Sequence, residues 1–585
     1  MVYFHDSIDN VIHDVIFLAV SFHQYNIDSV IHDAIQDHQP RRLYIVVLPE
    51  KLRRDLRREL RTDLRREPTL LQYFQRQGYQ VTLIWEHEFK NELNTDDELR
   101  QYYPLRQRYY AKMNKIGHVD IRESFYGGRT NNLFFNDDCK ENEIIKYKDV
   151  CSLYPTVLSK CEYPIGHPIV LSEFSSHNIN GYFGFIKCKV LPPKALYIPV
   201  LPMRLKNNKL VFALCGLCAS DKIDHCSHSD RERCLIGSWY SEELKLAITK
   251  GYKIEKIYEV LHYEQRTDDI FKEYINKWLK IKTEASGWPS TCITNEDKQN
   301  YITEYRVREN VELEFDKMEK NPGLRFIAKL MLNSLWGKLA QRPNQMKTKI
   351  CIQYDDYRRI ITDAKYVIKG EIMPNEKNII VNYKCIDDSY CNAGNTSIAL
   401  GSMVTANARI HLYKELDKIE NSSAGRVKYF DTDSVIYKHD VTKNWYDPIT
   451  GDFLGDMSDE IEKDYGANAY IDSFASCGPK NYGYRVRLAN GTAINKCKVK
   501  GIAITNELKA EINFDLIAKT AENYFINQIF TTTAKQLCFR TDKVHNVYTE
   551  KINKLYRAVS EKRVIVTYHP YYQTIPFGYI DEFTE

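Results

Sequence analysis

The segment KYFDTDSVIY, residues 428–437, places two aspartates inside a run that otherwise favours β-structure. The residues on either side of DTDS are largely β-branched or aromatic, and DTDS is typical of a turn, so the pattern predicts a β-hairpin with Asp431 and Asp433 at its tip. Two carboxylates this close repel each other and are costly to bury unless a cation binds them. The hairpin is therefore either an exposed polar turn or one part of a divalent-metal site.

A second acidic segment, IIKYKDVCSLYP at residues 144–155, favours the metal site. It predicts a strand that ends in Asp149 and leads into a turn. Taken alone, Asp149 is an ordinary strand-end acid. Placed beside the hairpin, its carboxylate would complete a cage for two Mg²⁺ ions about 4 Å apart, which activate an attacking hydroxyl and stabilise a leaving phosphate oxygen. Only a tertiary fold could unite segments so far apart in the sequence.

The segment NPGLRFIAKLMLNSLWGKLAQRPN, residues 321–344, predicts a helix that begins at Asn-Pro-Gly and ends at Arg-Pro-Asn. Helical spacing gathers two cations, an amide and an indole on one face, which would suit a triphosphate and a base pair. Cations that snorkel from an ordinary amphipathic helix are the alternative. The polar face is Arg325, Lys329, Asn333 and Trp336 beside Gly337, and the positions expected to pack are Ile327, Leu330, Met331, Leu335 and Leu339.

Taken in order, these segments resemble motifs A, B and C of family B DNA polymerases: DVCSLYP, KLMLNSLWGK and YFDTDS. FYGGRT (125–130) and GPKNYGY (478–484) resemble the Tyr-x-Gly-Gly loop and the Lys-x-Tyr motif of the protein-primed branch, which serves viruses, organellar plasmids and Maverick/Polinton-type mobile elements. The resemblance implies an α+β, right-hand polymerase fold with an antiparallel-sheet palm, helical fingers and a small thumb. It also implies a DNA-directed DNA polymerase that uses two Mg²⁺ ions.

Within that resemblance, Asp149 and Asp431 would be the catalytic carboxylates that bind Mg²⁺, with Asp433 beside them as the less certain member of the pair. Tyr154 resembles the steric gate that excludes a 2′-hydroxyl. Trp336 stands where the family usually has tyrosine, and an extra segment separates Lys282 from Arg325. The implied nucleotide-binding residues are Ser152, Leu153, Tyr154, Lys282, Arg325, Lys329, Asn333, Ser334, Trp336 and Gly337, and the implied DNA-binding residues are Tyr126, Gly127, Gly128, Thr432, Lys480 and Tyr482.

The resemblance also divides the chain into parts, with two insertions where the protein-primed branch carries its terminal-protein regions. Those regions contact a priming protein, so a terminal protein is an expected partner beside the DNA primer-template and dNTPs. The parts are an N-terminal region of unclear function (1–117), the template loop and first palm segment (118–170), a first insertion (171–264), fingers (265–345), a second insertion (346–395), a second palm segment (396–510) and a thumb (511–585).

Upstream of these motifs, no 3′–5′ exonuclease pattern is visible. Such a domain needs a strand-borne Asp-x-Glu and further aspartates for its own metal pair. The Asp-x-Glu pattern found there, Asp96 to Glu98, lies in a polar linker (about 90–118) after a charged helical stretch (51–67) and a strand-like stretch (78–89). We therefore expect the exonuclease to be absent or truncated and this chain not to proofread, as in a fragment of a longer polymerase.

The first insertion contains the cysteine-rich stretch LCGLCASDKIDHCSHSDRERC, residues 214–234. A Cys-x-x-Cys knuckle followed by Cys-x-His could bind Zn²⁺ tetrahedrally, and reduced structural thiols are the alternative. Such an ion would be structural, because nucleotidyl transfer needs hard oxygen ligands. The candidate ligands are Cys215, Cys218, Cys226, His228 and Cys234.

Charge and hydropathy exclude few partners. Basic and acidic residues nearly balance, 82 against 78, so DNA would be met by local basic grooves. The apolar runs are strand-length and no signal segment opens the sequence, which predicts an intracellular protein without membrane contact, in nucleus, cytoplasm or mitochondrion.

Two alternatives to a DNA-directed DNA polymerase remain. One is a reverse transcriptase or RNA polymerase, and the other is a non-catalytic nucleic-acid-binding relic of such a polymerase.

Overall fold

The computed structural model describes residues 117–581, apart from 387–390, 392–393, 395 and 544–545, and the backbone of three strands before them. Those strands, β1 (Val15–Ala19), β2 (Leu43–Leu48) and β3 (Gln80–Trp85), form a parallel sheet in that order. The predicted helix at 51–67 and the Asp96–Glu98 pattern lie outside the described residues. In the part that is described, no helix is long and apolar enough to cross a membrane.

The chain divides into two compact units. One comprises residues 117–342 with 393–585, and holds all the polymerase-like motifs. The other comprises residues 1–116 with 343–392. Its described second part is the predicted second insertion, an antiparallel sheet ordered β15-β17-β16 with one helix. The elements of this insertion are β15 (Lys347–Cys351), α13 (Tyr354–Thr362), β16 (Tyr366–Asn375) and β17 (Asn378–Cys385).

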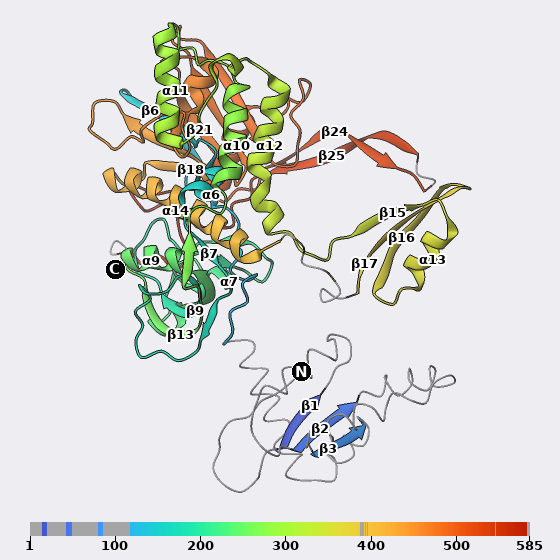
Figure 1. Ribbon diagram of the computed structural model, residues 1–585. Coiled ribbons are helices and arrows are strands. Elements are labelled where there is room, and N and C mark those ends of the chain that lie inside the picture. Colours follow the sequence, from blue (N-terminus) through green and yellow to red (C-terminus); the bar gives the residue numbers. More distant parts are fainter. Residues whose placement is uncertain are drawn as a thin grey trace. The chain divides into compact units, whose positions relative to one another are not determined.

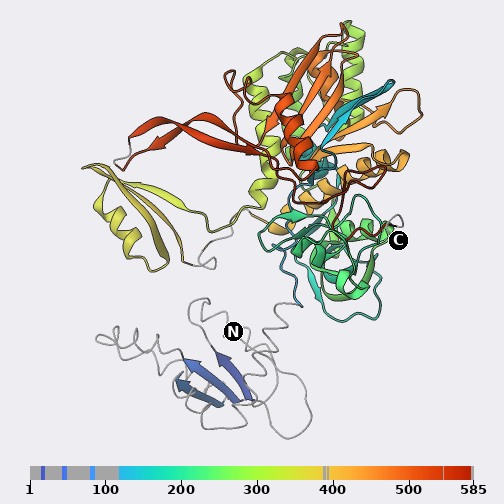
Figure 2. The same cartoon turned by 180° about the vertical axis from the view of Figure 1, so that it is seen from behind.

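The centre of the larger unit is a sheet of long and short strands (Figures 1 and 2). Among the described residues, nine strands belong to it. The pairings within it are antiparallel, and its main path is β23-β22-β21-β6-β19-β18-β4. The α+β class and the antiparallel sheet predicted from the sequence are confirmed. The strands are β4 (Thr130–Asn132), β5 (Asn136–Asp138), β6 (Glu143–Val150), β18 (Val427–Asp431), β19 (Ser434–Asp440), β20 (Met457–Asp459), β21 (Tyr470–Gly478), β22 (Asn481–Arg487) and β23 (Ala493–Val499).

Both faces of the hairpin strands are buried, which explains their nearly continuous apolar sequence. Phe430 and Val435 belong to the main core, together with residues of α14 (Ile398–Ser422), whereas Tyr429 and Ile436 pack in a separate cluster with β6 and β22. Successive side chains of a strand point to opposite faces, so the hairpin joins two cores. Its acidic tip is thereby held at a fixed place in the sheet.

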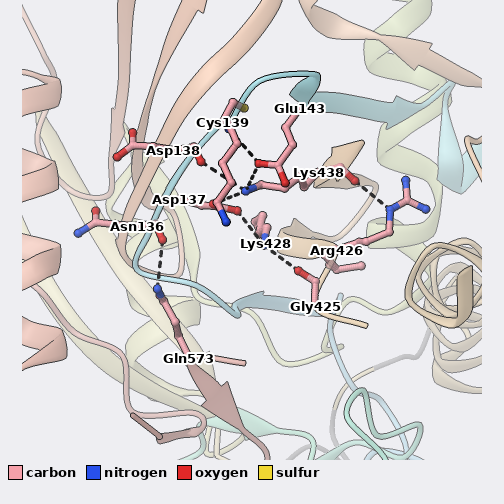
Figure 3. A network of polar contacts seen from close by, with 12 residues as sticks. Asn136, Asp137, Asp138, Cys139, Glu143, Gly425, Arg426, Lys428, Lys438 and Gln573 are labelled. Carbon is pink, nitrogen blue, oxygen red and sulfur yellow. Dashed lines mark hydrogen bonds and ion pairs between the residues drawn. The ribbon is translucent and has the colours of Figure 1, made fainter. Parts of the chain in front are cut away.

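Acid–base pairs hold the base of the hairpin (Figure 3). Asp137 of β5 lies 2.7 Å from the ammonium of Lys428 and 2.6 Å from that of Lys438, and Lys438 also contacts Glu143 at 3.0 Å. A buried ammonium is costly without such partners, so these lysines need the acids of β5 and β6. The pairs keep the strands in register behind the tip.

Helices lie along one side of the central sheet, and the motif-B helix packs among them (Figures 1 and 2). α12 (Pro322–Leu339) begins as predicted: the Asn321 side chain accepts from the Leu324 N–H, and proline follows at the first position. It packs with α10 (Lys272–Glu284), α6 (Leu153–Lys160) and α14. The extra segment between Lys282 and Arg325 contains α11 (Asn295–Glu309) and the 3₁₀ turn η1 (Phe315–Lys317).

The first insertion forms its own antiparallel sheet, ordered β12-β9-β13-β8, and α14 contacts both this sheet and the central one. Small elements complete it. The remaining bounds in this part are β7 (Tyr163–Ile165), β8 (Ile169–Leu171), β9 (Gly184–Leu191), β10 (Met203–Arg204), β11 (Leu210–Val211), α7 (Gly216–Asp221), α8 (Asp230–Arg233), β12 (Leu235–Tyr240), α9 (Ser241–Thr249), β13 (Lys253–His262) and β14 (Gln265–Thr267).

The C-terminal part, predicted as a thumb, contains several separate elements in its described residues. α16 (Phe514–Phe525) covers β21 and β22, and a long hairpin of β24 (Thr531–Thr541) and β25 (Val547–Arg557) extends beyond it (Figure 2). The chain then returns to the first insertion, where Val566 and Phe577 join the cluster around Cys215. Two short strands, β26 (Val564–Ile565) and β27 (Thr574–Ile575), lie in this returning segment. One helix not yet described, α15 (Glu460–Tyr465), lies between β20 and β21 in the sequence.

Candidate active site

The fold unites the two acidic segments that the sequence separates. β19 pairs with β6 so that Ser434 lies opposite Asp149, and the Val150 N–H donates to the Asp433 carbonyl at 2.7 Å. The turn at the hairpin tip requires a left-handed residue, which is Thr432 with φ 62°. This register sets Asp433 directly beside the end of β6, next to Asp149.

The carboxyl groups of Asp149 and Asp433 disfavour each other's charge. Burial and the neighbouring Asp433 carboxylate raise the pKa of Asp149 to about 7. Burial, with Asp431 nearby, also raises the pKa of Asp433. Glu460 of α15 adds further negative charge to both. Without a cation the two carboxylates therefore resist ionisation, and a bound divalent ion would stabilise their charged forms.

Asp431 has a different environment from Asp433. Its two carboxylate oxygens each accept from the Lys480 ammonium at 2.9 Å, and one also accepts from the Thr130 hydroxyl at 2.7 Å. The hydroxyls of Thr432 and Tyr429 donate to it as well, at 3.1 and 3.4 Å. The charge of Asp431 is thus already balanced by Lys480, and its lone pairs are already engaged.

The Tyr-x-Gly-Gly loop lies against the hairpin tip. The Thr432 N–H donates to the Arg129 carbonyl at 2.7 Å. A Cβ on Gly128 would lie 2.7 Å from the Thr432 hydroxyl, so a larger residue would push the loop away from the tip, whereas Gly127 is exposed with open space around it. Tyr126 is buried. The second glycine is therefore explained by close packing.

A buried ion pair between α14 and α9 holds the backbone of this loop in place. Arg409 of α14 makes a two-pronged contact with Glu243 of α9, with both bonds at 2.7 Å. Both side chains are almost fully buried. The same guanidinium donates to the carbonyls of Tyr126 at 2.7 Å and Gly127 at 3.2 Å. The position of the loop thus depends on a long-range charge pair.

Replacing Arg409 with methionine is expected to lower the free energy of unfolding by about 3–5 kcal/mol, because Glu243 would be left buried without its partner. Chemical denaturation followed by tryptophan fluorescence would measure it. The control is Lys418→Met on the same helix, because the Lys418 side chain is exposed and its pair with Glu415 should be worth about 0–1 kcal/mol. Equal losses in the two variants would contradict the structural role of Arg409.

A cluster of three cations, Lys282, Arg325 and Lys329, lies near the start of α6 and is here called the cationic cluster. Ser152 precedes the helix in a left-handed conformation, with φ 57°, and its hydroxyl accepts from the Lys282 ammonium at 3.2 Å. Burial lowers the pKa of Lys282, and the nearby Arg325 and Lys329 lower it further. Cations that disfavour each other's charge would be stabilised by an anion at the helix N-terminus.

The predicted gate and the motif-B indole meet beside this cluster. The rings of Tyr154 and Trp336 are stacked, with centroids 4.5 Å apart and planes 19° apart. Burial, together with the negative charge of Asp433, raises the pKa of Tyr154 to about 12. The ring of Tyr154 therefore lies within electrostatic reach of the carboxylates. Two aromatic residues that are far apart in the sequence thus form one stacked pair beside the carboxylates.

The motif-B helix packs less than the sequence predicted. Ile327 and Leu330, expected to be packed, are 50% and 55% exposed, and the residues buried in α12 are Ala328 and Leu332. The prediction was wrong for Ile327 and Leu330 because α12 contacts α10, α6 and α14 on one side, leaving its outer face to solvent. Met331, Leu335 and Leu339 are half-buried, and Arg325, Lys329, Asn333, Ser334 and Gly337 are exposed.

The Lys-x-Tyr motif has one exposed and one buried member. Lys480 is exposed beside Asp431, whereas Tyr482 is only 4% exposed. The Tyr482 ring packs 4.6 Å from that of Tyr429, and its hydroxyl lies 3.4 Å from the Tyr147 hydroxyl. Tyr482 therefore supports the hairpin from the core, and the side chain that reaches the surface here is Lys480.

A second candidate metal site lies in the first insertion. The sulfurs of Cys215, Cys218 and Cys226 lie 3.5, 3.3 and 3.8 Å from Nδ1 of His228, and all four ligand atoms lie within 4.8 Å of one another. Around a zinc ion with bonds of about 2.0–2.3 Å, tetrahedral ligand atoms lie roughly 3.3–3.8 Å apart, and the three sulfur–nitrogen distances fall in this range. The thiol of Cys234 instead donates to the Asp230 carbonyl at 3.1 Å, which sets it apart from the other predicted ligands.

Several residues at the site were not predicted from the sequence. Arg409 and Glu243 have no motif around them, and Lys562 lies in the charged stretch SEKRV, which is typical of an ordinary surface. Thr130 ends the FYGGRT segment, but the resemblance assigns it no role. The Lys562 ammonium donates to the Thr130 carbonyl at 3.0 Å. Burial lowers the pKa of Lys562 to about 8, against the opposing effect of Asp431. Local patterns give no signal for contacts that only the fold creates.

Comparison with known proteins adds family evidence. The family model of type B DNA polymerases of organelles and viruses matches residues 87–294 and 296–422, more than half of the chain. Curated relatives described as probable DNA polymerases, from Podospora anserina and Agaricus bitorquis, are 24% identical over 348 residues and 22% over 286 residues. The matches cover 54% and 46% of this chain but 23% and 28% of those proteins, so the chain spans about a quarter of their length.

Among solved structures, the chain is similar to Phi29 DNA polymerase complexed with primer-template DNA, with a TM-score of 0.45 and 18% identity over 77% of this chain and 64% of that one. It is also similar to the complex of the same polymerase with primer-template DNA and incoming nucleotides, with a TM-score of 0.45 and 18% identity over 75% and 62% of the two chains.

Proposed function

Because the chain belongs to the organellar and viral DNA polymerases of type B, we propose that it adds deoxynucleotides to a primer 3′-hydroxyl on a DNA template. The observation that carries the proposal is the half-buried pair of Asp149 and Asp433, which the pairing of β19 with β6 sets side by side. The raised pKa values of both carboxyl groups agree with a site that a cation would stabilise. The neighbouring cationic cluster of Lys282, Arg325 and Lys329 would match a triphosphate.

Polymerases of this family use divalent metal ions, and we propose Mg²⁺ at Asp149 and Asp433. Carboxylate oxygens are the hard ligands that Mg²⁺ prefers, and two such ions would polarise the primer hydroxyl and the leaving phosphate. The sequence favoured Asp431 as the second ligand, but its ion pair with Lys480 argues for Asp433. Asp431 would then hold Lys480 and Thr130 in place next to the metal site.

The incoming nucleotide would lie between α6, α10 and α12. Lys282, Arg325 and Lys329 would neutralise the triphosphate, helped by the backbone N–H groups of Leu153 and Tyr154 at the start of α6. The Tyr154 ring would lie under the sugar, where a 2′-hydroxyl would clash. Asn333, Ser334 and Gly337 would face the nascent base pair beside Trp336.

The remaining parts would handle DNA in a right-hand arrangement. The central sheet is the palm, α10 to α12 form the fingers, and α16 with the β24–β25 hairpin forms the thumb. Lys480 would hold the primer terminus, since it is the exposed cation nearest the carboxylates. The loop from Tyr126 to Gly128 would guide the template strand across Thr432 at the hairpin tip.

We also propose that replication is protein-primed and that the two insertions meet the priming protein and the DNA. The support is the position of the insertions, between the motifs, where that branch carries its terminal-protein regions. The fold of the first insertion around four potential zinc ligands supports a second, structural ion there. Thiolate and imidazole ligands suit Zn²⁺ and not the hard ions of nucleotidyl transfer.

Primer extension by the purified chain tests the proposal. With a primed DNA template and dNTPs, we expect template-dependent extension with Mg²⁺ and none without a divalent ion. A primer with a mismatched 3′ end, incubated without dNTPs, should keep its length if the predicted lack of proofreading holds. Retained DNA binding with no extension in either Mg²⁺ or Mn²⁺ would favour the non-catalytic relic.

A further inference from the structure

The four-residue metal site in the first insertion lies beneath the C-terminal residues 560–580, here called the C-terminal strap. Val564, Val566, Ile575 and Phe577 of the strap share one buried cluster with Cys215 and Cys218. The Leu214 N–H donates to the Phe577 carbonyl at 2.8 Å. The next residue is Gly578 with φ 82°, where a Cβ would collide with Cys215, so the strap lies directly on the knuckle.

The middle of the strap crosses the edge of the palm sheet. The Gln573 side chain accepts from the Phe135 N–H at 2.7 Å and donates to the Asn136 carbonyl at 3.2 Å (Figure 3). The Thr574 hydroxyl donates to the Leu133 carbonyl at 2.9 Å and accepts from buried Arg563 at 3.0 Å. These bonds attach the middle of the strap to residues 133–136 of the palm and to Arg563.

The other end of the strap reaches the catalytic hairpin. The Lys562 ammonium donates to the carbonyl of Thr130, and the hydroxyl of the same threonine donates to Asp431 at 2.7 Å. One residue earlier, Glu561 pairs with Lys209 and, at 3.8 Å, with Lys222 of the first insertion. Lys562 is therefore held between the insertion and the palm.

We propose that Cys215, Cys218, Cys226 and His228 bind a structural Zn²⁺ that seats the C-terminal strap, and that the seated strap makes Lys562 a positioning residue for the catalytic hairpin. The segment that carries these ligands has two short helices, α7 and α8, as its regular structure, and a bound metal would hold such short elements in one arrangement. Loss of the ion would loosen the strap along residues 560–580 and remove the hydrogen bond from Lys562 to the carbonyl of Thr130, the residue whose hydroxyl binds Asp431.

The first experiment needs no polymerase activity. Elemental analysis of the purified full chain should find about one zinc per chain, as expected for a four-ligand structural site. Cys215→Ser with Cys218→Ser should remove it, and Cys234→Ser, in the same segment but outside the cluster, should retain it. Hydrogen exchange within 560–580 should then become at least about tenfold faster in the double variant, while the β24–β25 hairpin is unchanged.

Chelation provides a route that does not depend on the folding of a variant. Wild-type protein stripped of zinc should show the same faster exchange at 560–580, and restoring Zn²⁺ should reverse it, whereas Mg²⁺ should not. Zinc-free wild-type protein as purified, or unchanged exchange after zinc removal, would overturn the proposal.

The part that concerns Lys562 rests on the proposed polymerase function. Lys562→Met should slow primer extension by about tenfold, the effect of one charge-assisted hydrogen bond, with zinc content and strap exchange unchanged. Lys253→Met, an exposed residue at the start of β13, is the matched control and should extend normally. Normal extension by Lys562→Met would show that Lys562 does not position the hairpin. If the wild-type chain fails to extend a primer, the proposed polymerase function is contradicted, and the zinc and exchange results still test the metal site and the strap.

Discussion

Replacing Asp433 with asparagine is expected to slow primer extension by about a thousandfold or more, since a lost metal ligand removes several kcal/mol of transition-state stabilisation. Asparagine keeps the shape of the side chain, so the hairpin should remain folded. Single-turnover extension of a labelled primer at saturating dNTP and Mg²⁺ would measure the chemical step. Circular dichroism of the variant would verify the fold.

The matched variant is Asp431→Asn, one residue away on the same hairpin. It should be less damaging, by about tenfold to a hundredfold, because it removes the partner of Lys480 but can still accept the Thr130 hydrogen bond. The comparison decides which hairpin carboxylate acts with Asp149. If Asp431→Asn is the more damaging of the two, the assignment of Asp433 as the ligand is wrong.

Replacing Tyr154 with alanine is expected to raise the incorporation of ribonucleotides relative to deoxynucleotides on the order of a hundredfold. The ring stacks on that of Trp336 at the start of α6, and it lies close enough to Asp433 for that charge to affect its pKa. Truncating it would open the space that a 2′-hydroxyl needs. The measurement is the ratio of kcat/KM for a ribonucleotide and the matching deoxynucleotide on one primer-template.

Tyr154→Phe keeps the ring and loses only the hydroxyl, so it should discriminate almost as well as the wild type. Relaxed discrimination in both variants would mean that the hydroxyl, not the bulk of the ring, excludes ribonucleotides. Unchanged discrimination in Tyr154→Ala would remove the gate from Tyr154 altogether. General loss of activity lowers both kcat/KM values and leaves their ratio unaffected, so it would not be mistaken for either result.

Much of the local structure could be predicted, because local structure follows from local chemistry. The β-branched and aromatic residues around DTDS predicted the hairpin that β18 and β19 form. Asn321 and the following proline predicted the start of α12. The spacing of Cys215, Cys218, Cys226 and His228 predicted a knuckle whose ligand atoms converge.

Predictions about packing failed where a segment's neighbours decide the outcome. The apolar positions of α12 have the period of a buried helix, yet Ile327 and Leu330 face solvent because nothing in this unit covers that side. Cys234 shares a segment with the other predicted zinc ligands but turns to the Asp230 carbonyl. A periodicity states which residues share a face, and the fold decides what that face meets.

The sequence by itself determined the elements that carry chemistry: a hairpin with two aspartates, a strand that ends in Asp149, a capped cationic helix and a cysteine knuckle. Only the tertiary structure decided how these act together. The register of β19 on β6 sets Asp433 beside Asp149, while Lys480 arrives from another hairpin to neutralise Asp431. A local sequence pattern treats Asp431 and Asp433 alike. Their surroundings differ because β6 and the Lys480 turn, which are far from the hairpin in the sequence, reach different aspartates in the folded protein.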